Sequence, residues 1–250
     1  MVTAIEIHHI SKEFKEGFSG KKVKAVEDLS LTVPCGEVFG FLGPNGAGKS
    51  STIKILVNLI FPDTGTAKIL DKEVHRPEVR KHLGYLPENP YFYDYLTPEE
   101  LLWFGGTASG MPKDVIKIRT DELLEKVNLQ DARKRPLRSY SKGMVQRAGI
   151  ALALIHDPEV VIFDEPMSGL DPVGRKLVGD IILELKNAGK TVFFSSHILT
   201  DIERFCDRAG VIVSGRLTLV ERIEALLQNG QTLEDVFLSE VAKSGMREIM

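Results

Sequence analysis

Residues 141–171 read SKGMVQRAGIALALIHDPEVVIFDEPMSGLD. A hydroxyl residue opens the segment, an apolar stretch of helical length follows, and a short apolar run then ends in Asp164 and Glu165. Such a short run bounded by turn formers is typical of a buried strand, and Pro166 predicts a turn after the two acids. Adjacent residues on a strand point to opposite faces, so both carboxylates can reach one site only at the strand's end. The segment therefore predicts a helix, a buried strand and a paired-carboxylate site.

A glycine-rich loop lies well upstream of this segment. Apolar residues at 38–42 predict a strand before it, and helical spacing over 50–60 predicts a helix after it, which is the context of a P-loop. Its glycines let the backbone turn sharply and approach an anion, and the start of the helix presents amide N–H groups to that anion. The residues expected to bind nucleotide are Gly43, Pro44, Asn45, Gly46, Ala47, Gly48, Lys49, Ser50 and Ser51.

Two residues of this loop have individual roles. Lys49 is expected to reach the β- and γ-phosphates, and the hydroxyl of Ser50 is expected to bind Mg²⁺. A P-loop alone indicates only a nucleoside triphosphate. A GTPase of the Ras type would need an Asn/Thr-Lys-x-Asp motif to read the base, which this sequence lacks. A nucleotide kinase would not need the second block at 141–171.

Taken together, the two blocks resemble the ATP-binding-cassette (ABC) ATPases, and the resemblance covers nearly the whole chain. It implies that Asp164 holds Mg²⁺, that Glu165 is the general base for the attacking water, and that His197 contacts the γ-phosphate. Phe14 occupies the position of the aromatic residue that stacks on adenine, an interaction that any base can make. The alternative for Phe14 is a simple core residue.

The resemblance also implies two motifs that act between chains. The signature, which would contact the ATP of a second chain, comprises Ser141, Lys142, Gly143 and Met144, and the D-loop comprises Ser168, Gly169, Leu170 and Asp171. The usual signature is Ser-Gly-Gly-Gln, so Lys142 and Met144 depart from it. The hydroxyl, the close-approach glycine and the helix N-terminus remain. Lys142 adds a cation that faces either the partner's triphosphate or solvent.

A further departure is Glu88, which replaces the glutamine of the family's Gln-loop. Its oxygen can still bind Mg²⁺, and we expect Glu88 to serve in both catalysis and metal binding, although it adds negative charge beside the triphosphate. These departures resemble a subfamily of exporters for drugs, ions or polymers. The ending LEDVFL at 233–238 is similar to that subfamily too.

Strand and helix signals alternate on both sides of a helical middle. Strands are predicted at 5–10, 24–33, 38–42, 67–70, 84–86, 160–163, 191–195 and 209–213, and helices at 50–60, 98–104, 114–127, 141–156, 172–187 and 198–205. Such alternation implies an α/β fold with a parallel sheet. With the resemblance, we expect a P-loop NTPase (RecA-like) core with an N-terminal antiparallel β subdomain and an inserted α-helical subdomain.

One ABC ATPase domain is expected over residues 1–250. Its core lobe would cover about 1–87 and 158–220, its helical lobe about 88–157 and its helical tail about 221–250. The net charge of −3 gives no reason to expect a nucleic-acid partner, since such domains are usually basic. Cys35 and Cys206 form no metal or redox spacing and are expected to be two buried thiols.

No stretch approaches the ~18 consecutive apolar residues of a spanning helix, and the N-terminus lacks the apolar core of a signal peptide. We expect a cytoplasmic protein that lies peripherally on the cytoplasmic face of the cell membrane through a partner. In the family each ATP lies between the P-loop of one cassette and the signature of another. The resemblance therefore implies ATP and Mg²⁺ as ligands, a second cassette chain in a homodimer, and a separate transmembrane permease.

Aromatic residues cluster after and beside the Gln-loop position. Aromatics are enriched among interface anchors, so we expect a mixture of permease docking and helical-lobe core among Tyr85, Tyr91, Phe92, Tyr93, Tyr95, Trp103 and Phe104. Two other functions stay open. One is an ABC ATPase acting in DNA repair or on ribosomes, whose members carry coiled-coil insertions or two cassettes. The other is an importer subunit of the sugar type, which usually has an extra C-terminal regulatory domain.

Overall fold

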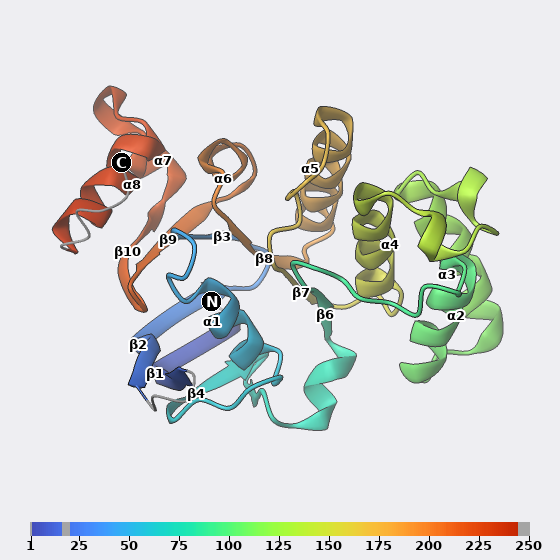
Figure 1. Ribbon diagram of the computed structural model, residues 1–250, viewed down its shortest axis with the longest axis horizontal. Coiled ribbons are helices and arrows are strands. Elements are labelled where there is room, and N and C mark those ends of the chain that lie inside the picture. The colour runs from blue at the N-terminus through green and yellow to red at the C-terminus, as the bar shows by residue number, and fades with distance from the viewer. Residues whose placement is uncertain (1, 17–20, 245–250) are drawn as a thin grey trace.

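The computed structural model describes residues 2–16 and 21–244, and these form two sheets with helices around them (Figure 1). The larger sheet has six strands in the order β10-β9-β3-β8-β7-β6. Its strands are β3 (Val38–Leu42), β6 (Leu83–Leu86), β7 (Val160–Phe163), β8 (Thr191–Ser196), β9 (Arg208–Val213) and β10 (Arg216–Arg222). All neighbours in it pair in parallel except β10 and β9, which are antiparallel.

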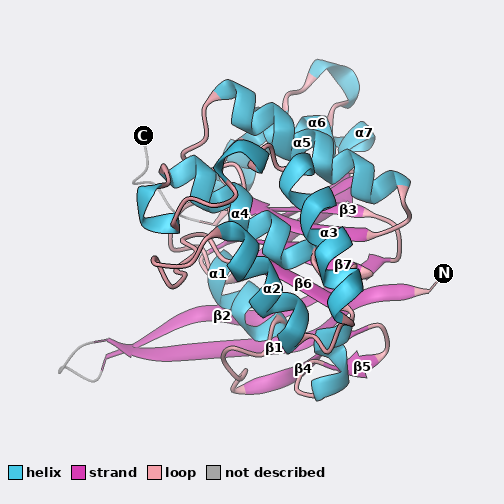
Figure 2. Cartoon of the chain, turned by 90° about the vertical axis from the view of Figure 1, so that its right-hand side faces the viewer, coloured by secondary structure: helices cyan, strands magenta, loops and turns pink. Residues whose placement is uncertain are grey.

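The smaller sheet is antiparallel, with the order β2-β1-β4-β5. Its strands are β1 (Thr3–Glu16), β2 (Lys21–Pro34), β4 (Thr64–Ile69) and β5 (Lys72–Glu73). Figure 2 shows β1 and β2 running together beyond the rest of this sheet. Both strands are longer than predicted, because their backbone pairing continues past the apolar residues. The expected antiparallel β subdomain is confirmed.

Three helices form a group beside the large sheet, on the right of Figure 1, and occupy the chain between β6 and β7. They are α2 (Pro98–Ala108), α3 (Lys113–Lys126) and α4 (Lys142–Leu154). Residues 87–159 contain no strand, as the sequence predicted. The remaining helices are α1 (Lys49–Leu56), α5 (Pro172–Asn187), α6 (Leu199–Phe205), α7 (Ile223–Leu226) and α8 (Leu233–Lys243), and short 3₁₀ turns occupy Pro77–Lys81, Gln130–Ala132, Leu137–Ser139 and Gln228–Gly230.

Several element ends differ from the prediction. The helix predicted over 50–60 ends at Leu56, because Asn58 adopts a left-handed backbone with φ 56°. The helix predicted from Ser141 begins at Lys142, with Ser141 as its N-cap. Strand β10 was not predicted, since it is a half-exposed edge strand without a continuous apolar run. The C-terminal tail contains helices α7 and α8, although its first two residues still belong to β10, and residues 245–250 lie outside the described chain.

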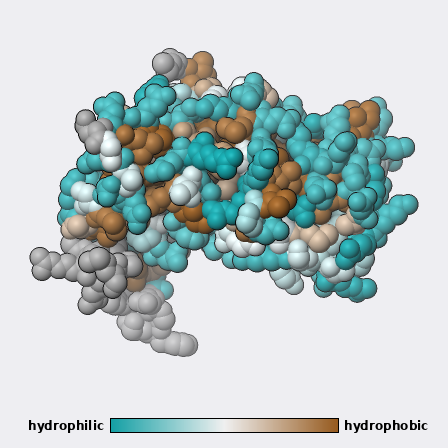
Figure 3. Space-filling model, turned by 90° about the horizontal axis from the view of Figure 1, so that it is seen from above, coloured by the Kyte–Doolittle hydropathy of each residue, from teal (hydrophilic) through white to brown (hydrophobic). Residues whose placement is uncertain are grey.

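The core lies on both faces of the large sheet. Phe163 and Phe194 pack on one face against the layer that contains α4, α5 and α6, whereas Phe41 and Phe193 pack on the other against α1 and the small sheet. Strands covered on both faces account for the continuous apolar runs in the sequence. In the described ranges, no helix combines the length and apolarity needed to cross a membrane. The surface seen in Figure 3 is mostly hydrophilic, with separate apolar patches.

The prediction of two buried thiols is wrong for Cys35. This residue is exposed in the turn after β2, where its backbone N–H donates to the carbonyl of Val2 at 3.0 Å. Cys206 follows α6 and is partly covered, and burial raises the pKa of its thiol well above the usual value.

Candidate functional site

The candidate site is a hollow of about 510 Å³ at the carboxyl ends of β3, β7 and β8. It is lined by P-loop residues 44–51 together with Glu88, Glu165, Ser168 and His197. The loop follows β3, Glu165 follows β7 and His197 follows β8, so three neighbouring parallel strands bring these residues to one edge. In open α/β sheets this edge is where ligands bind.

Glycines shape the loop that borders the hollow. A Cβ at Gly43 would come within 2.5 Å of the carbonyl oxygen of Ile212, and one at Gly48 within 2.2 Å of the carbonyl oxygen of Ala25. Gly48 also has φ 108°, which disfavours other residues. Helix α1 begins directly afterwards, and no side chain caps it. Its first amide N–H groups are therefore available to an anion.

Lys49 is almost fully buried, with 6% of its surface exposed. Its ammonium group donates to the carbonyls of Gly43 at 2.6 Å and Pro44 at 3.3 Å. The same Nζ lies 3.5 Å from Oε1 of Glu165. A cation is thus held at the mouth of the P-loop by its own loop and by one carboxylate.

The backbone turns at Glu165, one residue before Pro166. Glu165 has φ 51°, a left-handed conformation that is rare outside glycine. Its Oε2 lies 2.8 Å from Nδ1 of His197, and the buried amide of Gln146 donates to the carbonyl of Pro166 at 3.3 Å. This turn allows Glu165 to line the hollow although its neighbour Asp164 does not.

Asp164 lies behind the hollow, with 2% of its surface exposed. Its Oδ1 accepts from the hydroxyl of Ser195 at 2.6 Å, and no cationic side chain pairs with it among residues 2–16 and 21–244. Burial, and to a lesser extent the nearby charge of Asp164, raises the pKa of Tyr85 to about 12. A buried carboxylate without a cation is a candidate metal ligand.

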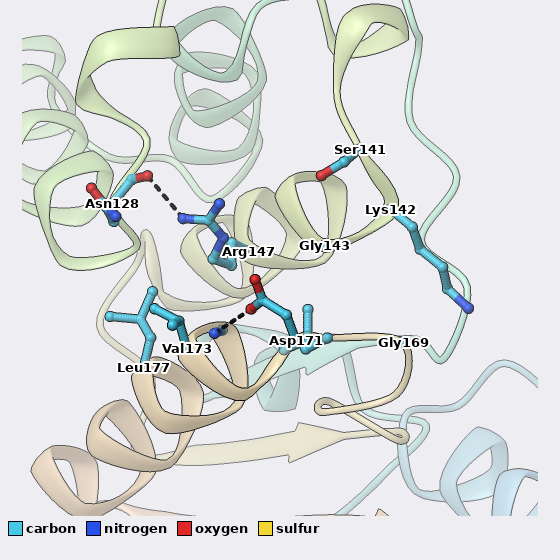
Figure 4. Close-up of a pocket in the computed structure, with 11 residues that line it drawn as sticks. Asn128, Ser141, Lys142, Gly143, Arg147, Gly169, Asp171, Val173 and Leu177 are labelled. Atoms are coloured by element: carbon cyan, nitrogen blue, oxygen red, sulfur yellow. Dashed lines mark hydrogen bonds between the residues drawn. The ribbon is translucent and has the colours of Figure 1, made fainter.

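Three of the four signature residues and three of the four D-loop residues line a second hollow of about 430 Å³ (Figure 4). Ser141 caps α4, with its Oγ accepting from the backbone of Met144 at 3.3 Å, and Asp171 caps α5, with its Oδ1 accepting from Gly174 at 2.7 Å. Ser141, Lys142 and Gly143 face this hollow from one side, and residues 169–171 face it from the other. The signature is therefore separated from the P-loop of its own chain.

The exposed side chain of Lys142 runs beside the D-loop and away from Arg147 (Figure 4). A Cβ at Gly169 would lie 3.3 Å from its Cδ, Cε and Nζ. No acidic side chain forms an ion pair with Lys142 within the described chain.

Four of the predicted site residues line neither hollow, namely Gly43, Asp164, Met144 and Phe14. Met144 lies in the first turn of α4 and packs partly on the core. Phe14 lies on β1, with 42% of its surface exposed, and pairs with Val23, two residues before Ala25. Since Ala25 lines the P-loop hollow, Phe14 is on the strand pair that borders it.

The aromatic cluster is divided in the structure. Phe92 packs on the core and Tyr85 is partly covered, whereas Tyr91 is 97% exposed. The rings of Tyr93 and Tyr95 lie next to each other in a tilted arrangement, with centroids 5.7 Å apart and planes at 34°. The exposed members are Tyr91, Tyr93, Tyr95, Trp103 and Phe104.

Sequence reasoning missed three residues at this site. Ala25 lines the hollow from β2, Gln146 bonds to the turn after Asp164, and Ser195 bonds to Asp164 itself. The signal for Ser195 was a polar residue ending an apolar strand. Gln146 gave a similar signal as a polar residue in an apolar helix. Nothing in the sequence distinguished Ala25.

A glycine loop between a strand and an uncapped helix, a buried lysine, and two carboxylates after another parallel strand of the same sheet define a P-loop nucleoside triphosphatase of the α/β class. The family model "ABC transporter" matches residues 26–168. The chain belongs to the ABC transporter family, as an ATP-binding, ATP-hydrolysing subunit.

Curated relatives agree with this family. The chain is 46% identical to an ABC transporter ATP-binding protein of Synechocystis sp., over 93% of this chain and 66% of that protein. It is 34% identical to the ABC transporter ATP-binding protein NatA of Bacillus subtilis, over 96% of this chain and 98% of NatA. The bacitracin transport ATP-binding protein BcrA of Bacillus licheniformis is 42% identical over 78% of this chain and 63% of its own length. The chain thus spans about two thirds of the length of several curated relatives.

Solved structures agree on the fold. An ATP-binding subunit of an ABC transporter superposes with TM-score 0.84 at 30% identity, covering 95% of this chain and 99% of that one. An ATP-binding cassette solved as a dimer in a post-hydrolysis state with ADP and Pi gives TM-score 0.81 at 22% identity, covering 88% and 98%. The second likeness concerns the fold alone.

Proposed function

We propose that this chain is the ATPase subunit of an export-type ABC transporter, and that two copies close around ATP to drive a separate permease. The observation that carries this proposal is the separation of the two hollows. One chain places its P-loop at one hollow and its signature at another. A second copy related by twofold symmetry would bring the missing half to each site.

In the proposed pair, residues 43–51 bind the phosphates and Lys49 neutralises the β- and γ-phosphates. Glu165 accepts the proton of the attacking water. Because a carboxylate only accepts, Nδ1 of His197 donates its hydrogen to Glu165, which holds the base in place and leaves Nε2 for the γ-phosphate. The ring of Phe14 stacks on the adenine ring of ATP. The signature helix of the second chain directs its positive end at the charge that develops on the phosphate.

The donor set at the site suits Mg²⁺, which prefers hard oxygen ligands. Ser50 and Glu88 line the hollow, and Asp164 is a buried carboxylate whose negative charge has no described cation beside it. These three residues would hold the ion, directly or through water. The ion would neutralise charge on the triphosphate.

The exposed aromatic residues support a docking surface for the permease, which would place the chain at the cytoplasmic face of a membrane. Tyr91, Tyr93 and Tyr95 precede α2, and Trp103 and Phe104 lie on it. Exposed aromatics in such a group are typical interface anchors. The two lobes and the tail, with the boundaries expected above, form one cassette in this proposal.

The proposal of export rests on Lys142, Met144 and Glu88, and one relative is named for bacitracin transport.

Sedimentation of Glu165→Gln with and without Mg-ATP tests whether two copies pair around ATP. A shift from monomer to dimer on adding ATP is expected. A monomer at saturating ATP would contradict the proposed pair.

A further inference from the structure

Ser195 occupies a position where one hydroxyl touches both acidic residues at the end of β7. Its Oγ donates to Oδ1 of Asp164 at 2.6 Å and accepts from the backbone N–H of Glu165 at 2.9 Å. The residue is fully buried at the end of β8, a strand paired in parallel with β7. A serine hydroxyl has one hydrogen, so its donor capacity is used entirely on Asp164.

These two bonds constrain different atoms. The bond to Oδ1 fixes the rotation of the Asp164 carboxylate and leaves Oδ2 for another ligand. The bond from the Glu165 N–H helps to hold the left-handed backbone that brings this side chain into the hollow. Such a backbone is unfavourable for a non-glycine residue and persists only where its surroundings hold it.

We propose that Ser195 is a positioning residue for ATP hydrolysis, which orients Asp164 toward the metal of Mg-ATP and Glu165 toward the attacking water. This inference rests on the proposed Mg-ATP site. Residues that hydrogen-bond a metal ligand commonly contribute 10- to 100-fold to metal affinity or activity. A merely structural serine would instead satisfy two buried polar groups, and its loss would lower stability without a specific effect on the metal.

The test compares wild type with Ser195→Ala, using Mn²⁺ as the probe metal and the non-hydrolysable analogue AMP-PNP. Free Mn²⁺ is followed by electron paramagnetic resonance. Ser195→Ala is expected to weaken analogue-dependent Mn²⁺ binding about 10- to 100-fold, while the affinity for the analogue without metal stays the same. In steady-state assays kcat should fall and the KM for ATP should change little. Ser195→Thr, which keeps the hydroxyl, should restore the metal affinity.

Thr191→Val is the matched control on the same strand. Its Oγ1 accepts from the backbone of Gly36 at 2.9 Å, at the opposite end of β8, so this variant also removes one buried hydroxyl. It should lower Tm as Ser195→Ala does but leave Mn²⁺ binding unchanged. If Ser195→Ala does not fold, Ser195→Cys, whose thiol is a weak donor, is measured with the same expectation of weaker metal binding.

The outcomes distinguish failure of the proposed Mg-ATP site from failure of the positioning role of Ser195. If wild type shows no analogue-dependent Mn²⁺ binding, the proposed Mg-ATP site is wrong. If wild type binds the metal and a folded Ser195→Ala or Ser195→Cys binds it equally well, Ser195 is structural and the present inference is overturned.

Discussion

Oε1 of Glu165 lies 3.5 Å from Nζ of Lys49, and both side chains are almost fully buried. Without nucleotide, the proposed base thus partly neutralises the proposed phosphate-binding cation. An incoming triphosphate must compete with Glu165 for Lys49. Once the phosphates hold Lys49, Oε1 of Glu165 would be free to accept from the attacking water while Oε2 keeps its contact with His197.

Lys49→Ala should abolish tight ATP binding, because the buried ammonium group is the only P-loop side chain that brings a full positive charge to the phosphates. Titration calorimetry with Mg-ATP measures this. Lys54→Ala, an exposed lysine on the same helix, is the control and should bind as wild type. Unchanged affinity in Lys49→Ala would refute the P-loop assignment.

Glu165→Gln should lose hydrolysis by roughly 10²- to 10⁴-fold, since general-base catalysis commonly contributes that much. Its ATP affinity should be equal to or above that of wild type, because the charge that competes for Lys49 is gone. Turnover and equilibrium binding are measured on the same preparation. Glu159→Gln, an acid that precedes β7 and pairs with His82, is the control. Near-normal turnover in Glu165→Gln would mean that another group is the base.

Glu88→Gln should retain most ATPase activity in the isolated protein, because the amide keeps an oxygen for the metal and removes one negative charge from the hollow. Steady-state ATPase assays across a range of Mg²⁺ concentrations check this. Complete loss of activity would assign the Glu88 carboxylate a role of its own, such as accepting a proton.

Lys142→Ala in the Glu165→Gln background should weaken the ATP-dependent dimer. A lysine at a helix N-terminus is unfavourable by up to ~1 kcal/mol, which an anion opposite it can offset. The dimerisation constant should also depend less on salt, since salt screens a charge pair. Lys113 is the first residue of α3, so Lys113→Ala removes a lysine from another helix N-terminus and serves as the control. A dimerisation constant unaltered at low and high salt would show a solvent-facing Lys142.

The two thiols should differ in reactivity. Thiolate is the reacting form, and burial raises the pKa of Cys206 well above its usual value, so little of it ionises near pH 8. Cys35 is exposed, and desolvation raises the pKa of its thiol less than that of Cys206, so Cys35 forms thiolate at a lower pH than Cys206. A thiol reagent should therefore modify Cys35 quickly and Cys206 only after unfolding. Cys35→Ser should abolish the fast phase, and a fast phase that survives would contradict this.

The sequence predicted the α/β fold and most strands, because strands covered on both faces require continuous apolar runs. It did not predict β10, whose exposed edge has no such constraint. The P-loop could be predicted because its chemistry is local: the strand, glycines, lysine and helix are contiguous. The partners of Ser195 and Gln146 could not be predicted, since they lie 31 and 20 residues away along the chain and come close only in the folded structure.

The four residues of the D-loop are divided between the two hollows. Ser168 lines the P-loop hollow, and the next three residues line the signature hollow. In a symmetric pair, each D-loop would therefore border both nucleotides, separated by a single peptide step. If one nucleotide moved the backbone between Ser168 and Gly169, the surroundings of the other nucleotide would change as well. Binding at the two ATP sites would then be coupled.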